Sequence, residues 1–276
     1  MVSRYPLIDV PSWKRDLVSA LLGDGVEVSI LYSRSGLVDH GQFLLNELAD
    51  RSAPRRVSNG SAPTAGAARG SQLSGENVRG GAKLGALLRR LPLASWAKRQ
   101  GIEIKRFETL RDPSAVAGLS ALRPDVVVLA GADLVPASML SVPTLATINP
   151  HYGLLPSYRG MNVTEWSVYH DDPVGVTVHK VDAGVDTGDI VLRERVEVEP
   201  IETLRTLRAK HQRLAQRMLR EAVHLIAANE STPIPQAAGE GRQFYRMHPR
   251  LRALVESKLK DGTYYRRLQS ERGSSG

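Results

Sequence analysis

The 276-residue sequence contains no cysteine, which excludes disulfides, thiolate metal sites and a cysteine nucleophile. No run of about eighteen apolar residues occurs, so we expect no membrane-spanning helix. The first residues also lack the basic-then-apolar order of a signal peptide. These absences predict a cytoplasmic protein with no membrane contact. Its length suits one large domain with a sizeable core and a smaller appendage.

Acidic residues are scarce in one stretch of the chain. Residues 51–100 contain ten basic side chains and a single acid, Glu76, so their net charge of +9 exceeds the +8 of the whole chain. Two interpretations stay open: a solvated arginine-rich linker, or a surface that attracts an anionic substrate or carrier. Residues 52–82 consist of Gly, Ser, Ala, Pro and Arg with scarcely an apolar side chain. We expect a mobile basic insertion there.

Hydrophobic patterning predicts alternating strands and helices over the first two thirds of the chain. Strands are expected at 5–10, 26–32, 101–104, 124–131 and 144–149, and helical spacing is present at 13–22, 43–48, 84–99 and 113–122. The continuous apolar run 124–131 is typical of a strand covered on both faces in a parallel sheet. The alternation therefore predicts an α/β fold with a Rossmann-like, doubly wound, mostly parallel sheet.

The last part of the chain has a different pattern. Segments 175–181 and 189–198 alternate as strands of a hairpin, with Asp186 near its tip. Residues 203–229 have the spacing of one long amphipathic helix. We expect a catalytic domain at 1–200, followed at 201–276 by this helix and a small helical appendage that ends in a floppy tail from residue 270.

Two turn-like motifs carry the chemistry. Asn149 and His151 follow the expected strand 144–149, and Asp186 lies in Val185-Asp-Thr-Gly-Asp-Ile190. An amide N–H can stabilise an oxyanion, an imidazole can carry a proton, and a nearby carboxylate favours the imidazolium form. Taken singly, the three residues are more simply a turn asparagine, a loop histidine and a hairpin-turn aspartate.

Taken together, these motifs resemble those of the formyltransferase family, which moves a formyl group from 10-formyltetrahydrofolate to an amine. Leu154-Leu-Pro156 and Arg159-Gly160 also match, and the resemblance extends with gaps from about residue 100 to 200. It implies the formyltransferase fold and catalytic roles for Asn149, His151 and Asp186.

The resemblance also implies that backbone groups in two stretches, 129–135 and 181–186, hold the pterin of the donor. The residues expected to bind it are Leu129, Gly131, Ala132, Asp133, Leu134, Val181, Asp182 and Val185. Asp133 departs from the family pattern, which more often has an uncharged or basic residue there.

Side chains next to the catalytic loop are the candidates for contacts with the acceptor amine. They are Tyr152, Met161, Asn162, Glu165 and Trp166. Glu165 suits an ammonium or a sugar hydroxyl. Tyr152 could stack on a substrate ring or fill space beside Leu154, and Trp166 could instead be a core residue.

Other histidines carry less signal. His179 lies within an alternating strand, and His211 and His224 lie on the long helix, so we expect packing or surface roles for them. No histidine or carboxylate spacing predicts a metal site.

We expect transfer of a formyl group from 10-formyltetrahydrofolate to a small-molecule amine, such as an amino sugar or a specialised metabolite. Pro11 removes a backbone N–H that a ribonucleotide phosphate would need after the first strand. Three alternatives remain: formylation of methionyl-tRNA, hydrolysis of the formyl donor, and a non-catalytic folate-binding protein. A nucleic-acid partner is disfavoured but stays open because of the basic stretch, and a homodimer stays open as well.

Overall fold

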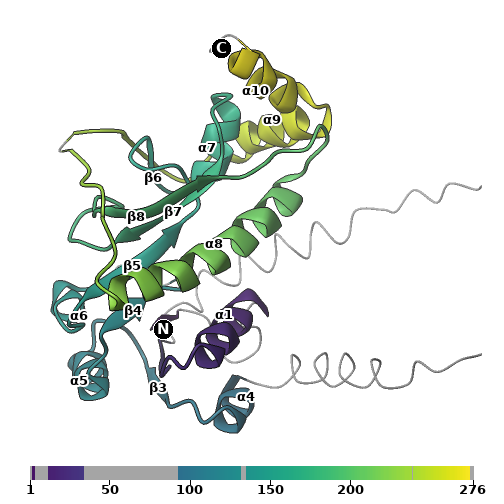
Figure 1. Cartoon of the computed structure of the whole chain (residues 1–276). Helices are drawn as coiled ribbons and strands as arrows, with labels where there is room; N and C mark the ends of the chain where they lie inside the picture. Colours follow the sequence, from purple (N-terminus) through teal and green to yellow (C-terminus); the bar gives the residue numbers. More distant parts are fainter. Residues whose placement is uncertain (1, 4–11, 34–92, 132–134, 238, 274–276) are drawn as a thin grey trace, which may run out of the picture.

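The computed structural model describes residues 2–3, 12–33, 93–131, 135–237 and 239–273 (Figure 1). The strand expected at 5–10, the helical spacing at 43–48, the insertion at 52–82 and most of the basic stretch lie outside these residues. Across the part that is described, no helix combines the length and the apolar character needed to cross a bilayer.

Strands of the described residues form two main sheets. In the first sheet, the strands are parallel and follow the order of the chain: β1 (Val2–Ser3), β2 (Ile30–Ser33) and β3 (Ile104–Phe107). In the second sheet, β4 and β5 are parallel, whereas the later strands are antiparallel: β4 (Val126–Val128), β5 (Ala146–His151), β7 (Gly175–Lys180) and β8 (Ile190–Arg195). This confirms the predicted α/β class, and the predicted hairpin is the pair β7–β8.

Helices cover both faces of the second sheet. Side chains of α1 (Ser12–Gly23) and α8 (Leu204–Ala227) pack with Val128 in one core cluster. Side chains of α5 (Pro113–Leu122) and α6 (Ala137–Leu140) pack with Val127 in another. Since neighbouring strand residues point to opposite faces, the apolar run of β4 is buried on both sides, as its sequence predicted.

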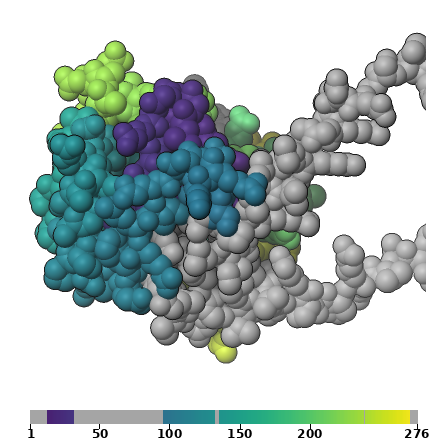
Figure 2. Space-filling model, turned by 90° about the horizontal axis from the view of Figure 1, so that it is seen from below, coloured from purple at the N-terminus to yellow at the C-terminus, as the bar shows by residue number. Residues whose placement is uncertain are grey.

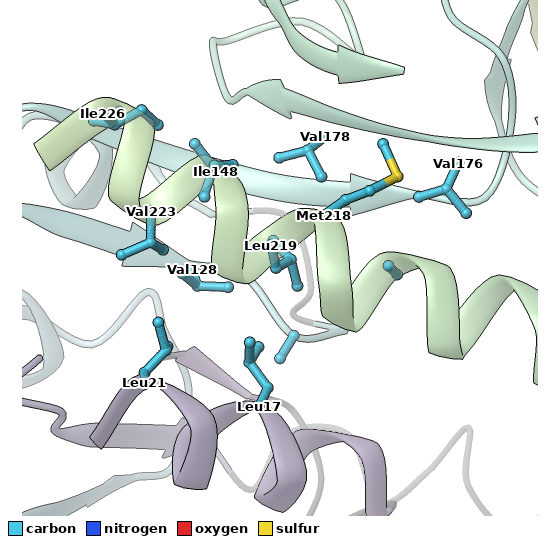
Figure 3. Close-up of a cluster of buried hydrophobic side chains, with 14 of the residues drawn as sticks. Leu17, Leu21, Val128, Ile148, Val176, Val178, Met218, Leu219, Val223 and Ile226 are labelled. Carbon is cyan, nitrogen blue, oxygen red and sulfur yellow. The ribbon is translucent and has the colours of Figure 1, made fainter. Parts of the chain in front are cut away.

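Figures 1 and 3 show how α8 lies along the sheet with α1 beside it, and Figure 2 shows α1 beside the region of α4 (Leu93–Arg99). Leu17 and Leu21 of α1 meet Leu219 and Val223 of α8 in the first core cluster. Because α8 buries one side in the core of the sheet, the packing favours assigning α8 to the same domain as the sheet. The division into domains at residue 200 stays a prediction.

Three further helices pack around the first turns of α8: α7 (Val163–Tyr169), α9 (Pro249–Lys260) and α10 (Thr263–Gly273). Two short strands, β6 (Tyr158–Gly160) and β9 (Arg242–Phe244), lie against α7. β6 pairs with β9 in a parallel two-stranded sheet. Leu204 and Leu207 of α8 share a core cluster with Val168 of α7, Leu259 of α9 and Tyr264 of α10.

Local signals explain several element ends. Asp112 accepts a hydrogen bond from the Ser114 N–H, and Pro113 occupies the first turn, so α5 begins where the sequence predicted. Thr203 and Thr206 form a reciprocal cap at the start of α8.

Several predicted boundaries are wrong. The strand expected at 144–149 spans Ala146–His151, so Asn149 and His151 lie within β5 and do not follow it. The strand expected at 26–32 begins at Ile30, because Val26 and Val28 pack against the core without entering the sheet. The strand expected at 101–104 begins at Ile104, since residues 101–103 lie in the turn after α4, where the Ile102 N–H bonds to the Ala97 carbonyl. The tail expected from residue 270 is helical through Gly273, as part of α10.

The core cluster around α8 predicts a stability effect. Leu219 is fully buried, so Leu219→Ala should lower the free energy of unfolding by about 2–5 kcal/mol, through lost burial and the cavity left behind. Arg213→Ala, at an exposed position of the same helix, should change it by less than about 0.5 kcal/mol. Urea denaturation measures both. Equal stability of the two variants would contradict the packing described for α8.

Candidate active site

The site is built around the end of β5 and the β7–β8 loop. β5 ends with Asn149, Pro150 and His151, and its antiparallel pairing with β7 sets Asn149 opposite His179. Asp186 lies in the loop that joins β7 to β8 and adopts a left-handed backbone with φ of 53°. The structure therefore brings together the three side chains that the sequence predicted to be catalytic.

The carboxylate of Asp186 has three neighbours. Its Oδ2 atom accepts a hydrogen bond from the backbone N–H of Gly160 at 2.8 Å and lies 3.3 Å from Nδ1 of His151. Its Oδ1 atom lies 3.5 Å from Nε2 of His179. Burial alone would raise the pKa of Asp186, but the interactions with His179 and His151 and the hydrogen bond from the Gly160 N–H together lower it to about 2. The group is thus a carboxylate at neutral pH.

His151 lies between two acceptors. Its Nε2 atom is 2.7 Å from the carbonyl oxygen of Tyr158, and its Nδ1 atom faces Asp186. The imidazole is 6% exposed. Burial lowers the pKa of His151 below its usual value, although Asp186 and the Tyr158 carbonyl oppose that shift.

The charge of Asp186 does favour the imidazolium form of His151, as the sequence predicted, but burial has the larger effect on the pKa. The prediction counted the nearby carboxylate but not the loss of water around the ring. In the folded chain the desolvation outweighs the charge interaction, so His151 is mainly neutral near pH 7.

His179 belongs to the site, contrary to the packing or surface role expected for it. Its Nδ1–H donates to the Lys180 carbonyl at 2.7 Å, which leaves Nε2 to accept from the Asn149 amide at 3.3 Å. This contact orients Asn149 and leaves the second amide N–H for another acceptor. Its position in the sequence could have indicated this role, because His179 is on the strand that leads into the Asp186 loop.

The backbone at residue 160 explains why the first motif has a glycine after Arg159. Its φ of 93° suits glycine, and a Cβ atom there would collide with the Phe244 carbonyl of β9. The close approach lets its N–H reach Asp186. Arg159 donates to Gln236 at 3.0 Å, and Gln236 donates to the carbonyl of Asp186 at 3.1 Å. Gln236, which follows α8 in the chain, thus holds the Asp186 loop in place. The sequence alone did not indicate this role.

The expected donor-binding stretches border the end of β4. The N–H groups of Leu129 and Val181 already bond to β5, at 2.8 Å each, and their side chains pack in the same core cluster. Asp182 accepts from the Gly184 N–H and the Thr187 hydroxyl within its own loop, and Val185 is 37% exposed. Gly131 is exposed with φ of 74°. Ala132, Asp133 and Leu134 lie outside the described residues.

Lys14 joins this region from α1. Its side chain is 1% exposed, and its Nζ donates to the carbonyl of Ala130, next to Gly131. Burial lowers the pKa of Lys14 to about 7. The location of Lys14 beside the expected donor-binding stretch was not predicted from the sequence, although its spacing of four from the buried Val18 puts it on the inner side of the helix.

A cavity of about 240 Å³ adjoins His151. It is lined by Pro150, His151, Tyr152, Gly160, Asn162, Val163, Glu165 and Arg208. Tyr152, Asn162 and Glu165, three of the residues expected to contact the acceptor, therefore lie in its wall. Tyr152 also packs against the core and meets the ring of His211 edge-on at 5.9 Å, so it fills space as well.

Met161 and Trp166 are not among the residues that line this cavity. Trp166 follows Glu165 on α7 and so points about 100° away around the helix. Its Nε1–H donates to the Tyr245 carbonyl at 2.8 Å, and its ring packs against Phe244. Met161 is 50% exposed. Trp166 is thus partly buried and packs against two core clusters, which favours the core role, while its contact with the acceptor stays a prediction.

Comparison with known proteins identifies the family of this segment. Residues 89–223 match the family model described as Formyl transferase, and this part of the chain belongs to that family. The methionyl-tRNA formyltransferase of Alkaliphilus oremlandii is 34% identical over 158 residues, which cover 56% of this chain and 51% of that protein. The corresponding enzyme of Synechococcus sp. strain JA-3-3Ab is 36% identical over 148 residues, 52% of this chain and 46% of the other. The chain thus spans about half the length of these relatives.

Solved structures share the fold at lower identity. A sugar N-formyltransferase from Shewanella sp. FDAARGOS_354 has a TM-score of 0.53 and 17% identity, over 88% of this chain and 74% of the other. A 4-N formyltransferase from Francisella tularensis has a TM-score of 0.53 and 18% identity, over 92% and 84%. The formyltransferase PseJ from Anoxybacillus kamchatkensis has a TM-score of 0.50 and 22% identity, over 64% and 91%, and its structure contains a formamido sugar nucleotide and tetrahydrofolate.

The lowered pKa of Asp186 predicts a pH-dependent contribution to stability. A carboxyl with a depressed pKa stabilises the fold above its unfolded value of about 3.9, and this is lost as the pH falls toward about 2. Asp186→Asn should therefore lower the free energy of unfolding by roughly 2 kcal/mol at pH 7, with the deficit shrinking between about pH 4 and pH 2.

Urea titrations at a series of pH values measure this deficit. Asp189→Asn, three residues further along the same loop, is the matched control and should follow the wild-type profile. A deficit for Asp186→Asn that stays constant down to pH 2 would contradict the ion pairing described for Asp186.

Proposed function

We propose that this chain transfers a formyl group from 10-formyltetrahydrofolate to the amine of a small molecule. The observation that carries the proposal is the carboxylate of Asp186, 3.3 Å from Nδ1 of His151, with Asn149 beside them and a cavity in front. Membership of the formyltransferase family supports the reaction type. The bound tetrahydrofolate of PseJ supports the class of donor.

Each side chain has a role in the proposed reaction. Attack of an amine on the formyl carbon forms a C–N bond and leaves negative charge on the formyl oxygen. The free N–H of Asn149 can donate to that oxygen, and such a donor typically contributes about 10²–10³ in rate. Breaking the bond from carbon to the donor nitrogen then needs a proton on the departing nitrogen.

His151 is suited to carry that proton. The Tyr158 carbonyl favours the tautomer with hydrogen on Nε2, so Nδ1 bears the lone pair. A proton taken from the amine, directly or through a water, then lies between Nδ1 and the Asp186 carboxylate, which stabilises the imidazolium. His151 can return it to the departing nitrogen. His179 acts as a positioning residue for Asn149.

The donor would lie in the crevice between the end of β4, the loop after β5 and the Asp186 loop. The stretches 129–135 and 181–186 stay our proposal for the pterin contacts. Glu165, Asn162 and Tyr152 stay our proposal for the acceptor contacts, because they line the cavity next to His151.

Methionyl-tRNA is the second candidate acceptor, favoured by the relatives that are 34% and 36% identical. Binding through several phosphates should weaken by orders of magnitude from low to moderate salt, whereas a small uncharged amine should show a shallow dependence. A steep salt dependence together with formylated methionyl-tRNA as product would replace the small-molecule acceptor in our proposal.

Release of tetrahydrofolate from 10-formyltetrahydrofolate tests the proposal. The protein should release it slowly alone and much faster when a suitable amine is added. Asn149→Ala and His151→Ala should each lower the amine-dependent rate by about 10²-fold or more, because one loses the oxyanion donor and the other the proton carrier. His224→Ala, on an exposed part of α8, is the control and should leave the rate near wild type.

Other outcomes identify the alternatives. Fast release without amine would indicate a hydrolase. Tight binding of a folate analogue without turnover over a broad panel of amines would indicate a binding protein. Near-native rates in both Asn149→Ala and His151→Ala would contradict the assigned mechanism.

A further inference from the structure

The wall of the cavity opposite the catalytic loop contains an ion pair between two helices. Arg208 of α8 donates from Nη2 to Oε1 of Glu165 on α7. The Asn162 amide donates to the same oxygen at 3.3 Å. All three residues line the cavity together with His151. The pair therefore faces the same space as the proton carrier of the proposed reaction.

The two charges differ in exposure. The Glu165 side chain is 3% exposed, whereas that of Arg208 is 36% exposed. A guanidinium has five N–H donors in a planar fork, and the contact to Glu165 uses one nitrogen. Glu165 thus fixes the orientation of the fork while donors remain for a ligand, which lowers the entropy lost when the ligand binds.

The other charged groups near the cavity do not compete with Arg208 for an anion. His211 lies behind Tyr152, and burial lowers its pKa to about 4, so it is neutral at pH 7. His151 is mainly neutral there too. Asp186 lies beyond His151 and is not among the residues that line the cavity. Arg208 is therefore the cationic side chain of this wall.

The cavity suits one group of a ligand. Its volume is about 240 Å³, and it is open on one side, so the rest of a larger ligand can extend outward. That space suits a small head group with an amine and an anionic group a few bonds apart. The amine would lie toward His151 and the anionic group toward Arg208.

We propose that Arg208 is a specificity-determining residue that binds a carboxylate or phosphate on the acceptor amine, held in position by Glu165. This inference rests on the proposed function, because it names the class of acceptor for the same site. The arrangement also revises the expectation for Glu165. Its Oε1 atom is bonded to Arg208 and Asn162, so its first task is to orient the guanidinium.

Binding of matched probes tests the proposal without requiring turnover. One pair is glucosamine 6-phosphate and glucosamine, and the other is methionine and its amide. Isothermal titration calorimetry with the full chain should show one anionic probe binding about tenfold or more tighter than its neutral counterpart. A preference within the glucosamine pair identifies the anionic group as a phosphate, and a preference within the methionine pair identifies it as a carboxylate.

The variants assign this preference to a residue. Arg208→Ala should abolish it, and Arg208→Lys should keep only part, since lysine retains the charge without the fork. Arg205→Ala, at an exposed position one turn earlier, should keep all of it. Arg208→Lys also serves if the alanine variant fails to fold.

Three results would overturn the proposal: equal affinity for the members of both pairs, a preference that survives in Arg208→Ala, and no binding of any probe. If the ion pair of Arg208 and Glu165 only holds α8 against α7, the Arg208 variants should change the stability of the protein without changing its selectivity among the probes. Failure of the proposed function is separate. It would appear as absent amine-dependent release of tetrahydrofolate while anion binding through Arg208 persists.

Discussion

One partly buried carboxylate, that of Asp186, connects three strands of the site. It bonds to the Gly160 N–H at the end of β6, faces His151 on β5 and lies near His179 on β7. Gly160 has the positive φ that its close approach to β9 requires, and His179 also contacts the amide of Asn149. Moving Asp186 would therefore disturb the surroundings of Asn149 and His151 together.

The support of this carboxylate extends beyond the segment that matches the family. Gln236, which bonds to the carbonyl of Asp186, and Phe244, which pairs next to Gly160, both follow residue 223. Arg208, on the long helix, reaches the cavity wall. The proposed catalytic groups and Arg208 are thus carried by the matched segment, while Gln236 and Phe244 from later elements support the Asp186 loop and Gly160.

Short-range patterns in the sequence predicted most of the fold. The apolar run before Gly131, the capped helix at Pro113 and the alternating hairpin each depend on neighbouring residues, and the structure confirms all three. Asn149, His151 and Asp186 were found because their residue types and order match the family motifs. The rest depends on long-range packing: the ion pair of Glu165 and Arg208 joins residues 43 positions apart. The pKa of His151 depends on burial, which a motif does not contain.

Titration of the His151 ring by ¹⁵N NMR measures directly whether Asp186 opposes the effect of burial on the pKa of His151. In the wild type, the pKa should lie below the usual value of about 6.5. Asp186→Asn should lower the pKa further, since the raising charge is gone while burial remains. A wild-type pKa above the usual value would contradict the dominant effect of burial on His151. A pKa that does not change in Asp186→Asn would contradict its charge interaction with Asp186.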